Sequence, residues 1–310
     1  MVEKIKGNSL VLFDNVQFIY ELALAQLELK AFGAKFELSP QLREFIVTNE
    51  STSWEEIRKR SAYFKLVKCK YTDYFFITQK NRTKSVNQYL THWIYPYKGK
   101  FHPQMIRALL NIIGLKIGDT VLDPFIGSGT TAIEAQLLGI NCIGIDISPL
   151  CVLQSKVKTE SITVFQEIIN WKEEVLNRSE MNLFNDEAIE SVIDKIKDER
   201  VRNFFLMAKL VAVSDNARRK KDFNKSFKTN LNLMLASVKD FIEIADRLNL
   251  TLGKIDIREG DARALNLESE SVDGIITSPP YSIALDYIEN DFHALKTLGY
   301  DPEKLREKFI

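Results

Sequence analysis

The sequence predicts an α/β fold built around a parallel sheet. The main observation is a strand–turn–helix–strand order: an apolar strand ends at Asp123, glycines follow at 127 and 129, a helix covers about residues 130–138, and a strand covers residues 141–145. This order is typical of a βαβ unit, whose two strands run parallel. Two more strand-like segments, residues 254–258 and 272–277, continue the pattern.

The composition is that of a globular protein with a sizeable core. Of 310 residues, 45% are hydrophobic and 27% are charged, which excludes a fully disordered or collagen-like chain. Lys plus Arg and Asp plus Glu both number 42, so nucleic-acid binding would require local segregation of charge. We see no signal peptide and no run of 18 uncharged apolar residues, and we expect a reduced, cytoplasmic protein.

No metal site is expected. The three cysteines are irregularly spaced, form no CxxC pair and lie far in sequence from the three histidines.

Residues 1–90 are expected to form an accessory α+β module. The apolar positions of residues 16–32 fit an amphipathic helix with Gly33 at its end, and the aromatic, β-branched residues 71–78 predict a strand. No motif in this region points to a chemistry.

Residues 91–310 are expected to form the main domain. An i, i+3, i+4, i+7 stripe predicts a helix over residues 106–113, and helical spacing of apolar residues predicts a mainly helical insertion at residues 160–250. A further helix is expected at about residues 286–298.

The segment DPFIGSGTT, residues 123–131, lies where parallel sheets bind ligands, at the carboxyl end of a strand and the start of a helix. Gly127 and Gly129 allow a sharp turn and a close approach of the backbone to a ligand. No Gly-Lys-Ser/Thr follows, which excludes a triphosphate-binding loop. The glycines alone also fit a tight turn that binds nothing.

Asp146 ends the next strand, 23 residues after Asp123. An acidic residue at about 20 residues spacing binds a ribose in dinucleotide-binding folds. A strand-end aspartate is as often a helix cap, here for the segment that begins Ser148-Pro149. Together with the glycine turn, an adenosine-type ligand is the better interpretation.

The segment TSPPY, residues 277–281, directly follows an apolar strand. Two prolines fix the backbone and remove two donors, which leaves carbonyl acceptors beside a hydroxyl and an aromatic ring. A nucleobase amino group needs such acceptors and a flat stacking surface. Alone, the motif could simply end a strand.

Taken together, DPFIGSGTT, Asp146, Asp261 in EGDARAL and TSPPY resemble the S-adenosylmethionine-dependent amino-methyltransferases that modify DNA bases, of the site-specific cytosine-N4 or adenine-N6 type. The segment HWIYPYKGKFHPQ, residues 92–104, resembles the lead-in of one branch of that family. The resemblance covers about residues 91–160 and 254–310. It implies a Rossmann-like methyltransferase sheet and S-adenosylmethionine as cofactor.

The resemblance also implies roles for matched residues. Those expected to bind the cofactor are Asp123, Phe125, Gly127, Gly129 and Thr130 at the methionine end, Asp146 with Ile147 at the ribose, and Asp261 with Ala262 at the adenine. Those expected to hold the target base are Ser278, Pro279, Pro280 and Tyr281. Tyr281 would stack on a base flipped out of the duplex.

Serine at position 278 resembles the cytosine-N4 enzymes, whereas adenine-N6 enzymes more often have Asp or Asn there. A tRNA guanine-N2 methyltransferase is the main alternative, because residues 21–28 resemble the opening of the accessory domain in that group; its members usually have Asp in place of Ser278. A non-catalytic nucleic-acid-binding module is a third interpretation. If DNA is the substrate, the resemblance implies a role in restriction-modification.

Charge distribution favours a nucleic-acid partner. Residues 74–118 contain seven Lys or Arg and no Asp or Glu, and residues 218–228 form a second basic cluster. A solvated face could equally explain the second cluster.

The sheet is expected to be incomplete at the C-terminus. A full methyltransferase sheet has seven strands, the motifs found here occupy four, and 29 residues follow Tyr281. We expect a fragment or a split protein, with a second chain or a missing C-terminal segment completing the sheet.

Overall fold

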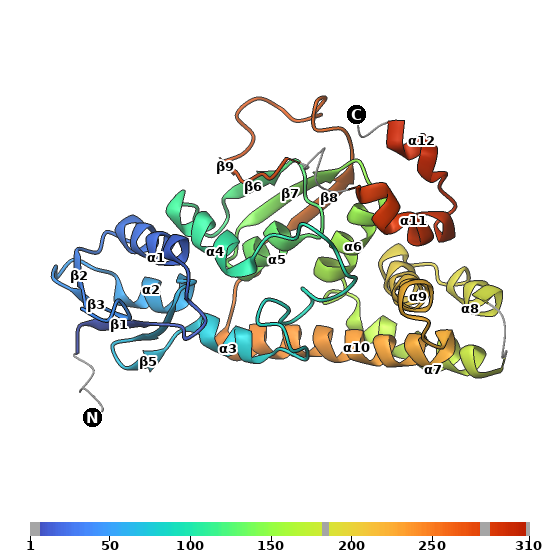
Figure 1. Cartoon of the computed structure of the whole chain (residues 1–310), viewed down its shortest axis with the longest axis horizontal. Coiled ribbons are helices and arrows are strands. Elements are labelled where there is room, and N and C mark those ends of the chain that lie inside the picture. The colour runs from blue at the N-terminus through green and yellow to red at the C-terminus, as the bar shows by residue number, and fades with distance from the viewer. Residues whose placement is uncertain (1–6, 182–185, 280–285, 308–310) are drawn as a thin grey trace.

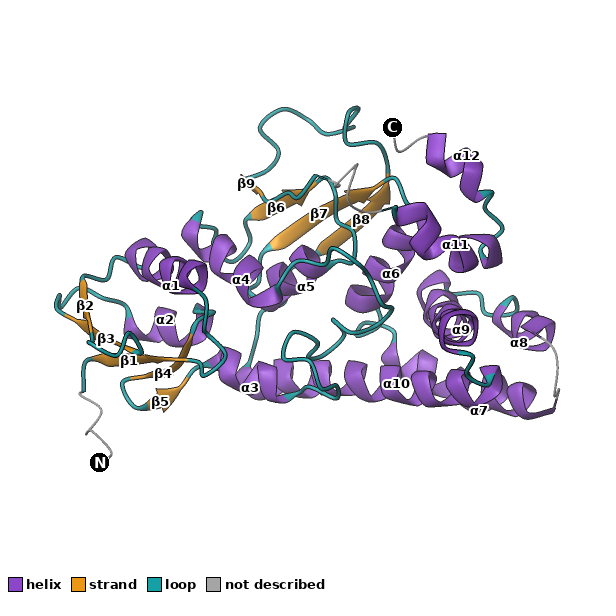
Figure 2. Ribbon diagram, viewed as in Figure 1, coloured by secondary structure: helices purple, strands orange, loops and turns teal. Residues whose placement is uncertain are grey.

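The computed structural model describes residues 7–181, 186–279 and 286–307. Its strands form two separate sheets, one near the N-terminus and one parallel sheet in the middle of the molecule (Figure 1). Helices pack around the parallel sheet and extend below and to one side of it (Figure 2).

The N-terminal sheet is antiparallel, with strand order β2-β3-β1-β4-β5. Its strands are β1 (Ser9–Leu12), β2 (Phe36–Leu38), β3 (Glu44–Val47), β4 (Phe64–Val67) and β5 (Lys70–Tyr71). The helices of this region are α1 (Ile19–Ala31), α2 (Trp54–Arg60) and α3 (Asp73–Gln79). Helix α1 confirms the helix expected within residues 16–32, and Gly33 follows it with φ of +74°.

The strand expected at residues 71–78 is wrong, because most of this segment is helix α3. The Thr72 hydroxyl accepts a hydrogen bond from the Phe75 amide at 3.2 Å and caps the helix. Tyr74 and Ile77, three residues apart, are buried on one face. The helical cap and this spacing outweigh the strand preference of the aromatic residues.

The middle sheet is parallel throughout, with strand order β8-β7-β6-β9. Its strands are β6 (Thr120–Asp123), β7 (Asn141–Asp146), β8 (Ile255–Glu259) and β9 (Gly274–Ile275). The helices α4 (Pro103–Ile112), α5 (Thr130–Leu137) and α6 (Pro149–Glu160) accompany it. The predicted βαβ unit and the Rossmann-like α/β fold are therefore confirmed.

Strand β9 is a short edge strand. It pairs with β6 through Gly274 and Ile275, and the Ile275 side chain is 58% exposed. The described part of the sheet thus ends in an apolar residue that is open to solvent.

Between α6 and β8, where the chain leaves the sheet, the described residues form four helices. They are α7 (Phe165–Met181), α8 (Asp186–Ile193), α9 (Glu199–Arg219) and α10 (Phe223–Leu248). Helix α10 runs beneath the sheet from α7 toward α3 and brings the chain back to β8 (Figure 1). After β9, α11 (Tyr287–Thr297) packs against α6 and α9, and α12 (Pro302–Arg306) packs against α11.

The hydrophobic core of the N-terminal sheet extends into helices of the rest of the molecule. Its cluster includes Ile133 and Leu137 of α5 as well as Phe241 and Ile244 of α10. The N-terminal region is therefore fixed to the parallel sheet by a shared core. In the described parts of the chain, no helix is both long and apolar enough to cross a bilayer.

Candidate cofactor and substrate site

A cavity of about 260 Å³ opens at the carboxyl ends of the parallel strands. Most of the predicted site residues line it, namely Phe125, Gly127, Thr130, Asp146, Ile147, Asp261, Ala262 and Ser278. The structure thus brings together residues from the ends of β6, β7, β8 and β9, as expected where parallel sheets bind ligands.

The turn after β6 needs its two glycines. Gly127 and Gly129 have φ of +51° and +78°, a region that is costly for other residues. A Cβ atom on Gly129 would lie 2.8 Å from Ser155 Oγ, and one on Gly127 would lie 3.3 Å from the Tyr97 ring. Gly129 packs against α6 and does not line the cavity, so its effect on the site is indirect.

Helix α6 holds this turn from behind. Ser155 Oγ donates to the Gly127 carbonyl at 3.1 Å, and Lys158 Nζ donates to the Ser128 carbonyl at 2.8 Å. Lys158 is fully buried, and burial lowers its pKa far below the usual range. The turn is thus fixed by side chains that do not reach the cavity.

Asp123 lies beneath the turn and is absent from the cavity lining. Its carboxylate accepts hydrogen bonds from the Phe125 amide at 3.1 Å and from Thr131 Oγ1 at 2.6 Å. Burial raises the pKa of Asp123 to about 6. Asp123 shapes the turn and does not face the cavity directly.

Asp146 connects the turns after β6 and β7. Its Oδ2 accepts from the Gly127 amide at 2.8 Å and its Oδ1 from the Ser148 amide at 2.9 Å. The side chain of Ser148, not that of Asp146, caps α6. Because each carboxylate oxygen has more than one lone pair, the half-buried Asp146 can still accept bonds from a ligand. Burial raises its pKa.

Asp261 lines the cavity but is engaged by Arg263, whose Nη2 lies 2.7 Å from Asp261 Oδ2. The hydrogen bonds from Arg263 lower the pKa of Asp261 to about 2. Ala262, between them, presents a small apolar surface to the cavity.

The target-base motif is described only in part. Ser278 lines the cavity, Pro279 is exposed and lies outside the lining, and Pro280 and Tyr281 lie outside the described residues. Strands β6 and β9 are hydrogen-bonded neighbours, so the glycine turn and Ser278 follow adjacent strands.

Two further segments line the cavity, although none of their residues was predicted to belong to the site. One is the loop before α4, with Tyr97, Gly99, Lys100 and Phe101. The other is α11, with Tyr287, Ile288, Asp291 and Leu295. The aromatic, acid-poor composition of residues 92–104 was a signal for the loop, but nothing in the sequence indicates which face of α11 meets the site.

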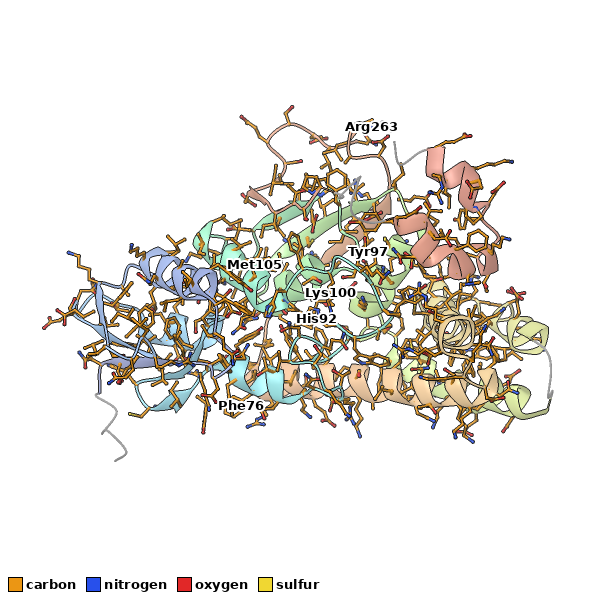
Figure 3. The ribbon with its side chains drawn as sticks, viewed as in Figure 1. Phe76, His92, Tyr97, Lys100, Met105 and Arg263 are labelled. Carbon is orange, nitrogen blue, oxygen red and sulfur yellow. The ribbon has the colours of Figure 1, made fainter. Side chains whose placement is uncertain are left out.

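The loop before α4 carries a half-buried lysine. Lys100 lies between Tyr97 and His92 in Figure 3, and its Nζ donates to the His92 carbonyl at 2.7 Å. Burial lowers the pKa of Lys100 to about 7. The Tyr97 ring, also in the cavity lining, stacks with the Tyr287 ring, with centroids 6.1 Å apart.

The basic clusters are largely paired within the molecule, which weakens the charge argument for a phosphate-binding surface. Four of the seven cations within residues 74–118 meet carboxylates: Lys80 and Arg82 with Asp240, Arg107 with Glu134, and Lys116 with Glu56. In the second cluster, Arg219 and Lys221 pair with Asp215. Among the residues that the structure describes, no group of three or more potential metal ligands is found.

A family model described as DNA methylase, covering amino-N6 and amino-N4 enzymes, matches residues 40–157. These residues include the glycine turn, Asp146 and the Lys100 loop. Through this region, the chain is similar to the DNA amino-methyltransferases.

Individual relatives agree with this family. The type II methyltransferase M.MjaII of Methanocaldococcus jannaschii is 37% identical over 42% of this chain and 24% of its own length. The type II methyltransferase M.BsoBI of Geobacillus stearothermophilus is 29% identical over 71% of this chain and 55% of its own length. A tRNA (guanine(10)-N2)-dimethyltransferase of Methanothermobacter thermautotrophicus is 32% identical over 31% of this chain and 27% of its own length. The chain thus spans about a quarter to a half of the length of these relatives.

Proposed function

We propose that this amino-methyltransferase binds S-adenosylmethionine in the cavity and methylates the exocyclic amino group of a base in DNA, with cytosine N4 as the target atom. The observation that carries the proposal is the shared cavity of Gly127 and Ser278, at the ends of two paired parallel strands. This arrangement leaves one space for a methyl donor and an amino acceptor.

The residues present fit the cofactor. The glycine turn presents backbone without side chains, Asp146 offers carboxylate oxygens to a ribose, and Ile147 and Ala262 offer an apolar surface to an adenine. When bound, S-adenosylmethionine supplies an electrophilic methyl group, so the protein needs no nucleophile of its own.

The protein's task is then to orient and polarise the acceptor nitrogen. An exocyclic amine is a weak nucleophile because its lone pair is delocalised into the ring. Ser278 Oγ and the Pro279 carbonyl can accept its N–H bonds and stabilise the positive charge that develops on nitrogen. Tyr281 is proposed to stack on the flipped base.

Serine at position 278 supports cytosine N4 over adenine N6. DNA as substrate is supported by the family and by the two type II methyltransferases, which also support a site-specific, restriction-modification role. The similarity to the tRNA guanine-N2 enzyme supports a second candidate, methylation of guanine in tRNA.

The test is transfer of tritiated methyl from S-adenosylmethionine to duplex DNA and to tRNA, with mass spectrometry of the released nucleosides. We expect label in DNA as N4-methylcytosine. Tyr281→Ala should abolish transfer and retain cofactor binding. Label in tRNA alone would favour the second candidate, and cofactor binding without label in either would favour a non-catalytic module.

A further inference from the structure

The cavity contains a carboxylate to which the proposed function gives no role. Asp291 comes from α11, its side chain is only 8% exposed, and it lines the cavity together with Asp146. Its partners are distant: Tyr95 Oη donates to Oδ1 at 3.5 Å, and Arg218 Nη2 lies 3.8 Å from the same oxygen. Charge-assisted hydrogen bonds are usually about 2.7–2.9 Å long.

A buried carboxylate with such long contacts is poorly compensated. Within the described residues, Arg218 is its one ion-pair partner within 4.0 Å. Burial raises the pKa of Asp291 to about 6, and the charge of Asp146 contributes in the same direction. A cation placed in this part of the cavity would stabilise both carboxylates.

The cavity also presents an amine. Lys100 lines it from the loop before α4. A cavity that presents a carboxylate and an amine suits a ligand with both an ammonium and a carboxylate group, such as the amino-acid end of S-adenosylmethionine.

We propose that the Asp291 carboxylate binds the protonated α-amino group of the methyl donor. The proposal rests on the proposed function and assigns a binding residue on α11, outside every motif of the sequence. The main alternative is that Asp291 only ties α11 to α9 through Arg218.

The test is calorimetric binding at pH 7 of three ligands: S-adenosylmethionine, S-adenosylhomocysteine, and 5′-methylthioadenosine, which lacks the amino-acid end. Asp291→Asn should weaken the first two at least tenfold and change the third less than twofold. Glu289→Gln removes a carboxylate from the exposed face of the same helix and should change none of them. Arg218→Met keeps the carboxylate and should retain the affinity for the first two ligands.

Several results would overturn the assignment. Asp291→Asn could bind all three ligands as the wild type does, lose affinity for S-adenosylmethionine alone, or lose affinity equally for all three ligands. The fourth such result is that Arg218→Met loses as much affinity for the first two ligands as Asp291→Asn does. If the wild-type chain binds none of the three ligands, the proposed function itself fails. Wild-type binding with any of the four results above contradicts only the role of Asp291.

Discussion

Asp123 shows how a motif residue can serve the fold more directly than the ligand. Its side chain is 1% exposed, and burial raises its pKa to about 6 from an ordinary value of 3.8. When the pKa of a carboxyl is higher in the folded state than in the unfolded state, its protonated form stabilises the fold. This contribution is fully present when the pH is below the pKa of the unfolded state. That contribution is lost as the pH rises through the folded pKa.

Asp123→Asn removes this ionisation and should change the pH dependence of stability. The free energy of unfolding of the variant minus that of the wild type should become more positive by roughly 1–2 kcal/mol between pH 5 and pH 7.5. Urea unfolding of both proteins at the two pH values measures this difference. A constant difference, or one that falls as the pH rises, would contradict the assigned shift.

For individual residues, the sequence predicted local geometry better than long-range proximity. The glycine turn and Asp146 could be predicted because a βαβ unit brings its strand ends together. Lys100 and Asp291 could not, because they are 191 positions apart and line the same cavity only through the docking of α11 against α6 and α9. Asp123 carried the right motif, but its side chain points beneath the turn.

Helices α4 and α5 join the N-terminal region to the parallel sheet through a buried polar cluster centred on Glu134. Its carboxylate accepts from Tyr89 Oη at 2.5 Å and His92 Nε2 at 2.9 Å, and Arg107 Nη1 lies 3.3 Å away. Burial opposes the ionisation of Glu134. The hydrogen bond from His92 and the charges of His92 and Arg107 outweigh this effect, and the pKa of Glu134 is lowered. Arg107 also donates to the Arg60 carbonyl at 2.9 Å.

Arg107→Met should be strongly destabilising, because it leaves Glu134 without its fully buried cationic partner. We expect a loss of about 3–5 kcal/mol in the free energy of unfolding, measured with urea at pH 7. Lys116→Met breaks an exposed ion pair with Glu56 and should cost at most about 1 kcal/mol. Similar losses in the two variants would contradict a structural role for the buried cluster.

At the element scale, capping and packing decided where the predictions failed. Residues 71–78 have strand-forming side chains, but the Thr72 cap and the buried pair Tyr74 and Ile77 fix a helix. The strand expected at residues 272–277 pairs only at Gly274–Ile275. The helices around the cavity were predicted as helices. The spacing of apolar residues within a helix, however, does not indicate which helix covers the cavity.

In the whole molecule, the cavity is lined by residues from the ends of the parallel strands, from the loop before α4 and from α11. The N-terminal sheet supports this arrangement from one side through its shared core with α5 and α10, and the helices α7–α10 extend below it (Figure 1). The parallel sheet was predictable from periodicity and glycine turns. The shared core was not, because its contacts join residues more than a hundred positions apart.

A crystal structure of the chain with S-adenosylhomocysteine would show directly whether donor and base share the cavity. We predict that the ligand lies against the Gly127 turn and Asp146, with its sulfur facing Ser278. A ligand bound elsewhere, or turned so that its sulfur faces away from Ser278, would contradict the claim that donor and base share this cavity.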